Sequence, residues 1–210
     1  MTKINDICNY EDDKNNKIII NGKLKYSPQM NITFTECNAY IEISDGVNLT
    51  DCDITLGKNS RLTIGSGSTI KGRVSIGAFS SITIGEQLSV TSNLYMRVVE
   101  STSLIIGRDC LVASDVIIRT NDGHPIYDTN SKCRINQSKN IVIEDHVWIG
   151  DQVAVLKGVT IGRGSIIAMR SVVTKDIPEK CVAAGIPATV VRHNTTWEHN
   201  SSNHSPEYYD

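Results

Sequence analysis

One histidine of the chain lies where its type and surroundings could support acid–base chemistry. His124 stands in the polar segment 119–140, within the run Asp122-Gly123-His124-Pro125. A neutral imidazole near pH 7 can take a proton from a hydroxyl group and return it later, as a general base does. A loop histidine can also be a plain surface residue. Chemistry is favoured because this segment is where an otherwise regular repeat is interrupted.

The other histidines and the cysteines carry weaker signals. His146 occupies a corner of the repeat, where a surface side chain is expected, and no role is assigned to the three histidines after residue 192. The six cysteines are scattered without a Cys-x-x-Cys pair, which indicates reduced and mostly packed thiols rather than a metal or disulfide framework. Cys133 lies near His124 in the sequence, but the pattern disfavours it as a nucleophile.

A six-residue period must position these candidates. From residue 143 to 178 the sequence divides into six consecutive hexads, and every first position is a β-branched aliphatic residue. These first positions are Ile143, Ile149, Val155, Ile161, Ile167 and Val173. A weaker form of the repeat begins at Ile106, and Leu-Gly or Ile-Gly pairs recur between residues 56 and 85 at a spacing nearer 20 residues.

The period and the composition predict the same fold. Six residues make one short strand and one corner, so three strands and three corners close an 18-residue triangular coil whose inward side chains stack in columns. The chain has 28 Ile and 17 Val against 9 Leu, with 11 aromatic residues, which suits a narrow aliphatic interior. We therefore predict an all-β parallel β-helix with one protruding loop at about 119–140. Trp148 is too large for such an interior.

The chain divides into three parts on this pattern. They are a polar N-terminal segment (1–17), the β-helix domain (18–192) and a polar tail (193–210) that is expected to be exposed. The charge is nearly balanced, with 21 Lys+Arg against 23 Asp+Glu, which disfavours binding to nucleic acid or to an acidic membrane. No apolar stretch approaches the ~18–20 residues of a membrane span, and no secretory signal is recognised, so a cytoplasmic protein is expected.

Four motifs, in order, resemble those of the hexapeptide-repeat O-acetyltransferases. They are Asp122-Gly123-His124-Pro125, Val147-Trp148-Ile149-Gly150, the segment 173–178 (VTKDIP) and the segment 183–188 (AAGIPA). The resemblance is strongest to the bacterial enzymes that acetylate surface polysaccharides, including sialic acid capsules. It implies a left-handed coil, acetyl-CoA as the donor, and a homotrimer with active sites between subunits.

The resemblance also implies roles for individual residues. His124 would be the general base that activates a sugar hydroxyl for direct attack on acetyl-CoA, without an acyl-enzyme or a metal. Trp148 would pack near the thioester and the acetyl group. The other positions that match the CoA channel or the CoA phosphates are Gly150, Met169, Thr174, Lys175 and Arg192. On charge and position alone, Lys132 and Arg134 are candidates for binding an anionic sugar.

Several alternatives remain open on the sequence. The acceptor could be a small nucleotide-linked sugar or an amine. A zinc carbonic anhydrase on the same fold needs about three ligands, whereas the repeat region offers only His124 and His146. A non-catalytic β-helix scaffold is the third reading. Two departures from the family also stand out: Asp151 and Met169 replace smaller residues, and the N-terminal helices of the small-sugar enzymes have no counterpart.

Overall fold

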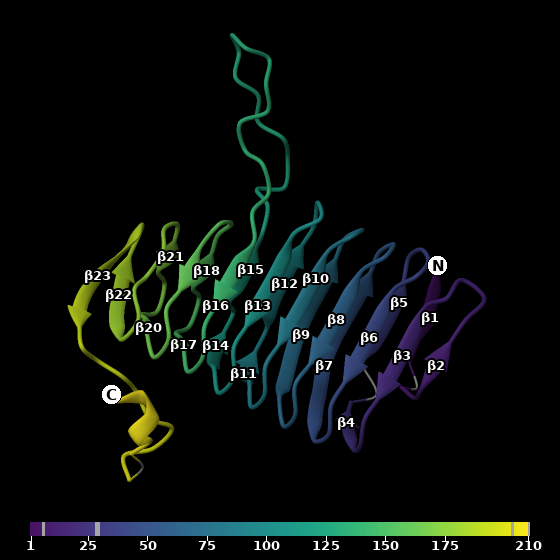
Figure 1. The fold of residues 1–210 in the computed structure, drawn as a ribbon, viewed down its shortest axis with the longest axis horizontal. Coiled ribbons are helices and arrows are strands. Elements are labelled where there is room, and N and C mark those ends of the chain that lie inside the picture. The colour runs from purple at the N-terminus through teal and green to yellow at the C-terminus, as the bar shows by residue number, and fades with distance from the viewer. Residues whose placement is uncertain (6, 28–29, 203, 210) are drawn as a thin grey trace.

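The computed structural model of the chain describes residues 1–5, 7–27, 30–202 and 204–209. Short strands stack into a long parallel β-helix, from which one loop projects (Figure 1). The strand ladders are parallel except at the two ends, where β1–β5, β2–β3 and β22–β23 pair antiparallel. In the described ranges the helical part is a single 3-10 turn, η1 (Pro206–Tyr208). The prediction of an all-β parallel β-helix with a protruding loop is confirmed.

The first face of the coil is a separate sheet. Its members, from the C-terminal end, are β19 (Thr160–Ile161), β16 (Ile141–Ile143), β13 (Ser103–Ile106), β10 (Ser81–Ile84), β8 (Arg61–Ile64), β6 (Tyr40–Ile43), β3 (Lys17–Ile20) and β2 (Tyr10–Glu11).

The second and third faces are joined because two long strands, β7 (Val47–Leu56) and β9 (Thr69–Ile76), bend around the corner between them. Besides the first halves of β7 and β9, the second face holds β4 (Leu24–Tyr26), β11 (Ser89–Ser92), β14 (Leu111–Ser114), β17 (Trp148–Ile149), β20 (Ile166–Ile167), β22 (Cys181–Gly185) and β23 (Ala188–His193). Besides their second halves, the third face holds β1 (Thr2–Ile4), β5 (Asn31–Phe34), β12 (Leu94–Val98), β15 (Ile117–Arg119), β18 (Ala154–Val155) and β21 (Val172–Val173).

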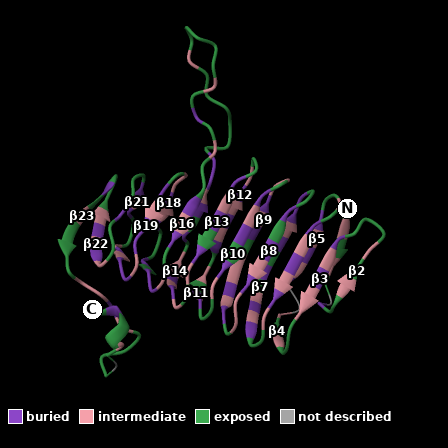
Figure 2. Ribbon diagram, viewed as in Figure 1, coloured by how far each residue is buried: buried purple, intermediate pink, exposed green. Residues whose placement is uncertain are grey.

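The interior consists of aliphatic columns that run along the coil axis. In the first face, strand register aligns Ile43, Ile64, Ile84, Ile106, Ile143 and Ile161, all at most 2% exposed. The hexads are in 18-residue register, since Ile149 pairs with Ile167 and Val155 with Val173. Figure 2 shows burial alternating along the strands, as the pleat requires.

The Ile-Gly pairs mark strand ends where successive coils approach closely. A Cβ atom on Gly65 would lie 2.4 Å from the carbonyl carbon of Gly85, so a larger residue there would push the coils apart. The pairs therefore reflect backbone packing between coils.

The segments outside the regular coil lie at its margins. At the N-terminal end, β1 pairs with β5 and β2 with β3. The loop leaves the corner between β15 and β16. The tail runs along the opposite edge of the stack (Figure 1). No helix within the described residues has the length and apolar character that a bilayer span requires.

Candidate functional site

The loop between β15 and β16 presents His124 to solvent and holds it by the backbone. The His124 ring is exposed, and its carbonyl oxygen accepts a hydrogen bond from Asn136 Nδ2 at 2.9 Å. An antiparallel bridge between Tyr127 and Arg134 closes the outer part of the loop. His124 therefore lies just inside the point where the two arms of the loop pair.

Asn136 is the residue that ties these arms together, and it was not singled out from the sequence. It is 8% exposed. Its Nδ2 also donates to Asp122 Oδ2 at 2.8 Å, and its Oδ1 accepts from the Ile126 backbone N–H at 2.6 Å. One amide thus holds the His124 carbonyl oxygen, the Ile126 N–H and the Asp122 carboxylate, so Asn136 is a positioning residue for His124.

Lys157 anchors the base of the loop to the next coil. Its Nζ lies 2.5 Å from Asp122 Oδ2. The hydrogen bond from Lys157, helped by the one from Asn136, lowers the pKa of the Asp122 carboxyl below its ordinary value despite some desolvation. Asp122 is therefore ionised at neutral pH and links the loop to the segment that follows β18.

The returning arm of the loop is held by a second carboxylate. Arg134 Nη2 donates to both Glu100 oxygens, at 2.9 and 3.1 Å, and Ser138 Oγ donates to Glu100 Oε2 at 2.7 Å. These bonds from Ser138 and Arg134 lower the pKa of Glu100. Arg134 is thus engaged inside the protein, whereas Lys132 is exposed near the loop tip.

Removing the Asn136 amide is expected to loosen the loop without unfolding the coil. In Asn136→Ala the Ile126 N–H loses its acceptor, at a local cost of about 1–3 kcal/mol. Hydrogen exchange at the Ile126 amide should therefore accelerate at least tenfold. Gln137→Ala, an exposed neighbour, is the matched control and should leave exchange at Ile126 unchanged. Equal protection in Asn136→Ala and wild type would contradict the positioning role.

Trp148 lies outside the coil, as its size predicts. It is the first residue of β17, is 39% exposed, and pairs with Leu111 on one side and Ile166 on the other. Its ring centroid lies 6.1 Å from that of Trp197 in the tail. Trp148 therefore faces solvent from the edge of the coil along which the tail runs.

Within one copy of the chain, His124 and Trp148 are not brought together. The loop leaves the corner that precedes β16, and Trp148 follows the corner at the other end of β16. The two corners are separated by one face of the triangle, roughly 15–20 Å at about 3.3 Å per residue. The loop projects away from the coil in addition (Figure 1).

The residues matched to the CoA channel occupy the C-terminal coils but more than one face. Gly150 and Met169 meet at one corner, where a Cβ on Gly150 would lie 2.8 Å from the Met169 backbone nitrogen. Met169 is 60% exposed. Thr174 and Lys175 are exposed after β21, and Arg192 is exposed on β23. Within one copy of the chain, the residues matched to the CoA channel therefore lie on several faces of the coil.

Asp151, one of the two departures from the family pattern, has a structural task. Its Oδ1 accepts a hydrogen bond from the Ser114 backbone N–H at 3.0 Å and so ties two coils together at a corner.

The prediction that His146 is a surface residue is wrong. It does occupy a corner, with φ 57°, but its side chain is fully buried. Its ring stacks between Trp197 and Tyr208, at centroid distances of 4.3 and 3.6 Å. Its Nδ1 lies 2.7 Å from Asp109 Oδ2 and its Nε2 lies 2.8 Å from the Trp197 carbonyl oxygen. Each ring nitrogen thus has an oxygen atom within hydrogen-bond distance.

The tail covers this corner with two buried aromatic residues, although most of its other described residues are exposed, as predicted. Trp197 and Tyr208 are only 7% and 3% exposed. Trp197 Nε1 donates to the His146 carbonyl oxygen at 2.8 Å, and His199 Nε2 lies 2.9 Å from Asp109 Oδ1. The missed signal was the presence of large aromatic residues in an otherwise polar segment.

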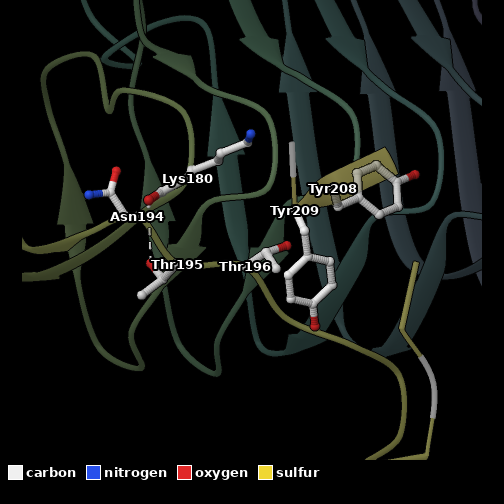
Figure 3. A pocket seen from close by; sticks show the side chains of 6 residues that line it. All are labelled: Lys180, Asn194, Thr195, Thr196, Tyr208 and Tyr209. Atoms are coloured by element: carbon white, nitrogen blue, oxygen red, sulfur yellow. Dashed lines mark hydrogen bonds between the residues drawn. The ribbon is translucent and has the colours of Figure 1, made fainter. Parts of the chain in front are cut away.

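A hollow of about 380 Å³ lies where the tail meets the last coil, and Figure 3 shows the side chains that line it. It is lined by Lys180, Asn194, Thr195, Thr196, Tyr208 and Tyr209. Thr196 Oγ1 is buried there and has no hydrogen-bond partner among the described residues. None of the residues predicted from the sequence lines this hollow.

Acid is expected to release the tail. Burial alone would raise the pKa of Asp109, but hydrogen bonds with His199 and His146 outweigh it and lower the pKa below the ordinary 3.8. A carboxylate with a lowered pKa stabilises the fold above its unfolded pKa and loses this effect as pH falls. Tail packing should therefore weaken below about pH 4, seen as a change in tryptophan fluorescence. Asp109→Asn should flatten this acid response, and an unchanged response would contradict it.

The described residues contain no group of three or more His, Cys, Asp or Glu side chains arranged to hold a metal ion. His146 and His199 share Asp109, but their contacts are those of a packed hydrogen-bonded cluster.

Comparison with known proteins places these features in context. Residues 140–175 match the family described as bacterial transferase hexapeptide (six repeats). A polysialic acid O-acetyltransferase of Escherichia coli O1:K1 / APEC is 38% identical over 134 residues, 64% of this chain and 43% of that protein. A galactoside O-acetyltransferase of Escherichia coli (strain K12) is 36% identical over 138 residues, 66% of each. The chain thus spans less than two thirds of the length of either curated relative.

The crystal structure of the polySia specific acetyltransferase NeuO is similar over most of the fold. It superposes with a TM-score of 0.86 at 35% identity, covering 90% of this chain and 80% of that one.

Proposed function

This chain belongs to the hexapeptide-repeat O-acetyltransferase family, and on that premise we propose that it transfers acetyl from acetyl-CoA to a sugar hydroxyl of a bacterial surface polysaccharide. An acidic glycan containing sialic acid is the acceptor we favour. The observation that carries the proposal is the exposed His124 ring on a loop that Asn136 holds through the His124 carbonyl oxygen, the Ile126 N–H and the Asp122 carboxylate. The relatives named polysialic acid O-acetyltransferase and polySia specific acetyltransferase support the acceptor class.

The proposed reaction is a direct transfer. The acceptor hydroxyl oxygen attacks the thioester carbonyl carbon while His124 takes the hydroxyl proton. The tetrahedral intermediate then collapses, the carbon–sulfur bond breaks, and the imidazolium returns the proton to the leaving CoA thiolate. Holding the acceptor and the thioester together in the right orientation supplies much of the remaining acceleration. Asp122 and Asn136 contribute by keeping His124 in place.

The proposed site needs two copies of the chain. His124 and Trp148 lie at different corners of one coil, so a single copy cannot apply both to one substrate. In a homotrimer with sites between subunits, the loop of one copy would approach Trp148 of its neighbour. Gly150, Met169, Thr174, Lys175 and Arg192 would then receive CoA, with the two basic side chains near its phosphates. Lys132, exposed on the loop, remains a candidate for contact with an anionic sugar.

The activity is tested with acetyl-CoA and a panel of acceptors. Purified protein should acetylate polysialic acid, detected as added acetyl mass in the product and as release of free CoA. A small galactoside is the second acceptor to test, because the galactoside O-acetyltransferase relative favours it. A nucleotide-linked sugar and an amine complete the panel. If the protein releases CoA with none of these acceptors, the proposal is overturned.

Mixing two defective variants tests the shared site. His124→Ala and Trp148→Ala should each be impaired as homotrimers. After they are unfolded together and refolded, a site with His124 from one copy and Trp148 from the next forms in about a quarter of positions. Activity should therefore return to about that fraction. No recovery in mixed trimers would show that both residues serve the same copy.

A further inference from the structure

We propose that the third face carries a binding site for the negatively charged groups of the glycan acceptor, formed by Arg73, Arg97 and Arg119 and ending at the base of the His124 loop. This site deepens the proposed function and rests on it. It would hold carboxylates of an acidic polysaccharide at a distance from the reacting hydroxyl.

The three arginines point outward from adjacent strands of one face. Arg97 on β12 pairs in register with Arg119 on β15, and Ser75 on β9 pairs with Arg97. Arg73 lies two residues before Ser75, so its side chain leaves the same surface. Neighbouring strands are about 4.8 Å apart, and like charges directly opposite each other destabilise a sheet. The Arg97–Arg119 pair is therefore unfavourable in the absence of an anion, whereas Arg73 lies opposite Tyr95 and Asp53.

The neighbouring acids do not neutralise this column. Six ion pairs form among the described residues, and none includes Arg73, Arg97 or Arg119. The Nε atoms of Arg97 and Arg119 are buried and lack a hydrogen-bond partner in the described part of the chain. Because Nε is shielded from solvent in both side chains, an external carboxylate would bind the outer Nη atoms of the two guanidinium groups.

Two carboxylates beside the column make hydrogen bonds to other residues of the chain. Asp53, the register partner of Arg73, accepts a hydrogen bond from Asn31 Nδ2 at 2.9 Å. Asp122, which feels the charge of Arg119, gives its Oδ2 to Lys157 and Asn136. Cations therefore outnumber acids along this face toward the loop.

A groove accompanies the column. A hollow of about 420 Å³ is lined by Lys3, Asp53, Arg73, Ser75, Tyr95 and Arg97, among others. A second hollow of about 380 Å³ shares Asp53, Arg73 and Tyr95 with it and also contains Asp51. Guanidinium groups bind carboxylates in a bidentate manner, and the hydroxyl groups and the tyrosine ring offer polar and apolar contacts to a sugar. The arginines suit the carboxylates of an acidic glycan, and Asp53 would accept hydrogen bonds from its hydroxyl groups.

The direction of the groove links it to the chemistry. Arg119 is the last residue of β15, and the chain passes from it into the loop that carries His124. A polymer lying on Arg73 and Arg97 would thus extend toward the loop base. Because a polymer repeats its carboxylates, affinity should rise with its length, and salt should weaken it.

The test compares Arg97→Gln/Arg119→Gln with wild type, with polysialic acid as the probe and a size-matched dextran as the neutral polymer. The double variant should raise the KM for polysialic acid about tenfold or more while kcat stays within about twofold. Arg61→Gln is the matched control, because Arg61 lies on the first face with its guanidinium 4.4 Å from the Tyr40 ring centroid. It should leave both constants unchanged.

Measurements of polymer binding and of Tm distinguish failure of the arginine site from failure of the proposed acetyl transfer. Wild-type protein should bind polysialic acid but not dextran, and the double variant should lose this binding without a lower Tm, because a like-charge pair has been removed. Unchanged KM and unchanged polymer binding in the double variant would overturn the site while leaving the proposed function standing. Arginine-dependent polymer binding without any acetyl transfer would instead sink the proposed function and retain the site.

Discussion

Replacing His124 with alanine is expected to lower acetyl transfer by ~10²–10⁴-fold, the usual contribution of a general base. The loss should fall on kcat, since a hydroxyl is a poor nucleophile until its proton is removed during attack. The fold should survive, because the ring is exposed and the backbone oxygen that Asn136 binds remains in the variant. CoA release and acetylated product are the measurements, with circular dichroism to confirm folding.

His204→Ala is the matched control for this prediction. His204 is an exposed tail residue outside the proposed site, so its removal should not change the rate. Equal rates of CoA release by wild type and His124→Ala, with every acceptor tested, would support the reading of the β-helix as a non-catalytic scaffold.

The largest expected effect on stability comes from a single column residue. Ile106 is 1% exposed, between Ile84 and Ile143 in the first face, so Ile106→Ala should lower the free energy of unfolding by about 2–5 kcal/mol. Coils in a solenoid contact only their neighbours, so a cavity in a central coil weakens the contacts on both sides. Denaturant unfolding followed by circular dichroism measures the change.

The adjacent residue provides the control for this cavity. Ile105→Ala deletes the same atoms from the same strand, but Ile105 is 44% exposed and points away from the column. Its replacement should cost less than about 1 kcal/mol. Equal losses in the two variants would show that the inward columns do not carry the stability of the coil.

Most of the fold could be predicted from the sequence because its information is local and repeated. Each hexad specifies one strand, one corner and one inward side chain, and repetition of the same pattern places Ile143 over Ile161 and Ile149 over Ile167. The loop could be predicted for the same reason, since segment 119–140 breaks the period. His124 could be placed outside the interior because it lies in that loop, and Trp148 because its side chain is too large for the interior.

The contacts that position these residues could not be predicted in the same way. Asn136, Glu100 and Lys157 act on the loop through hydrogen bonds between segments that share no periodicity. Nothing in the local sequence around any of them indicates its partner.

The tail and the arginine column are two further features that local sequence does not predict. His146 reads as a surface corner until Trp197, 51 residues later, packs over it. Arg97 and Arg119 lie 22 residues apart in the sequence, and winding of the coil places them opposite each other. The sequence by itself thus determined the coil, its columns and the place of the loop, because short-range period encodes them. Only the tertiary structure decided which polar groups meet, because winding the coil brings together residues that no local pattern connects.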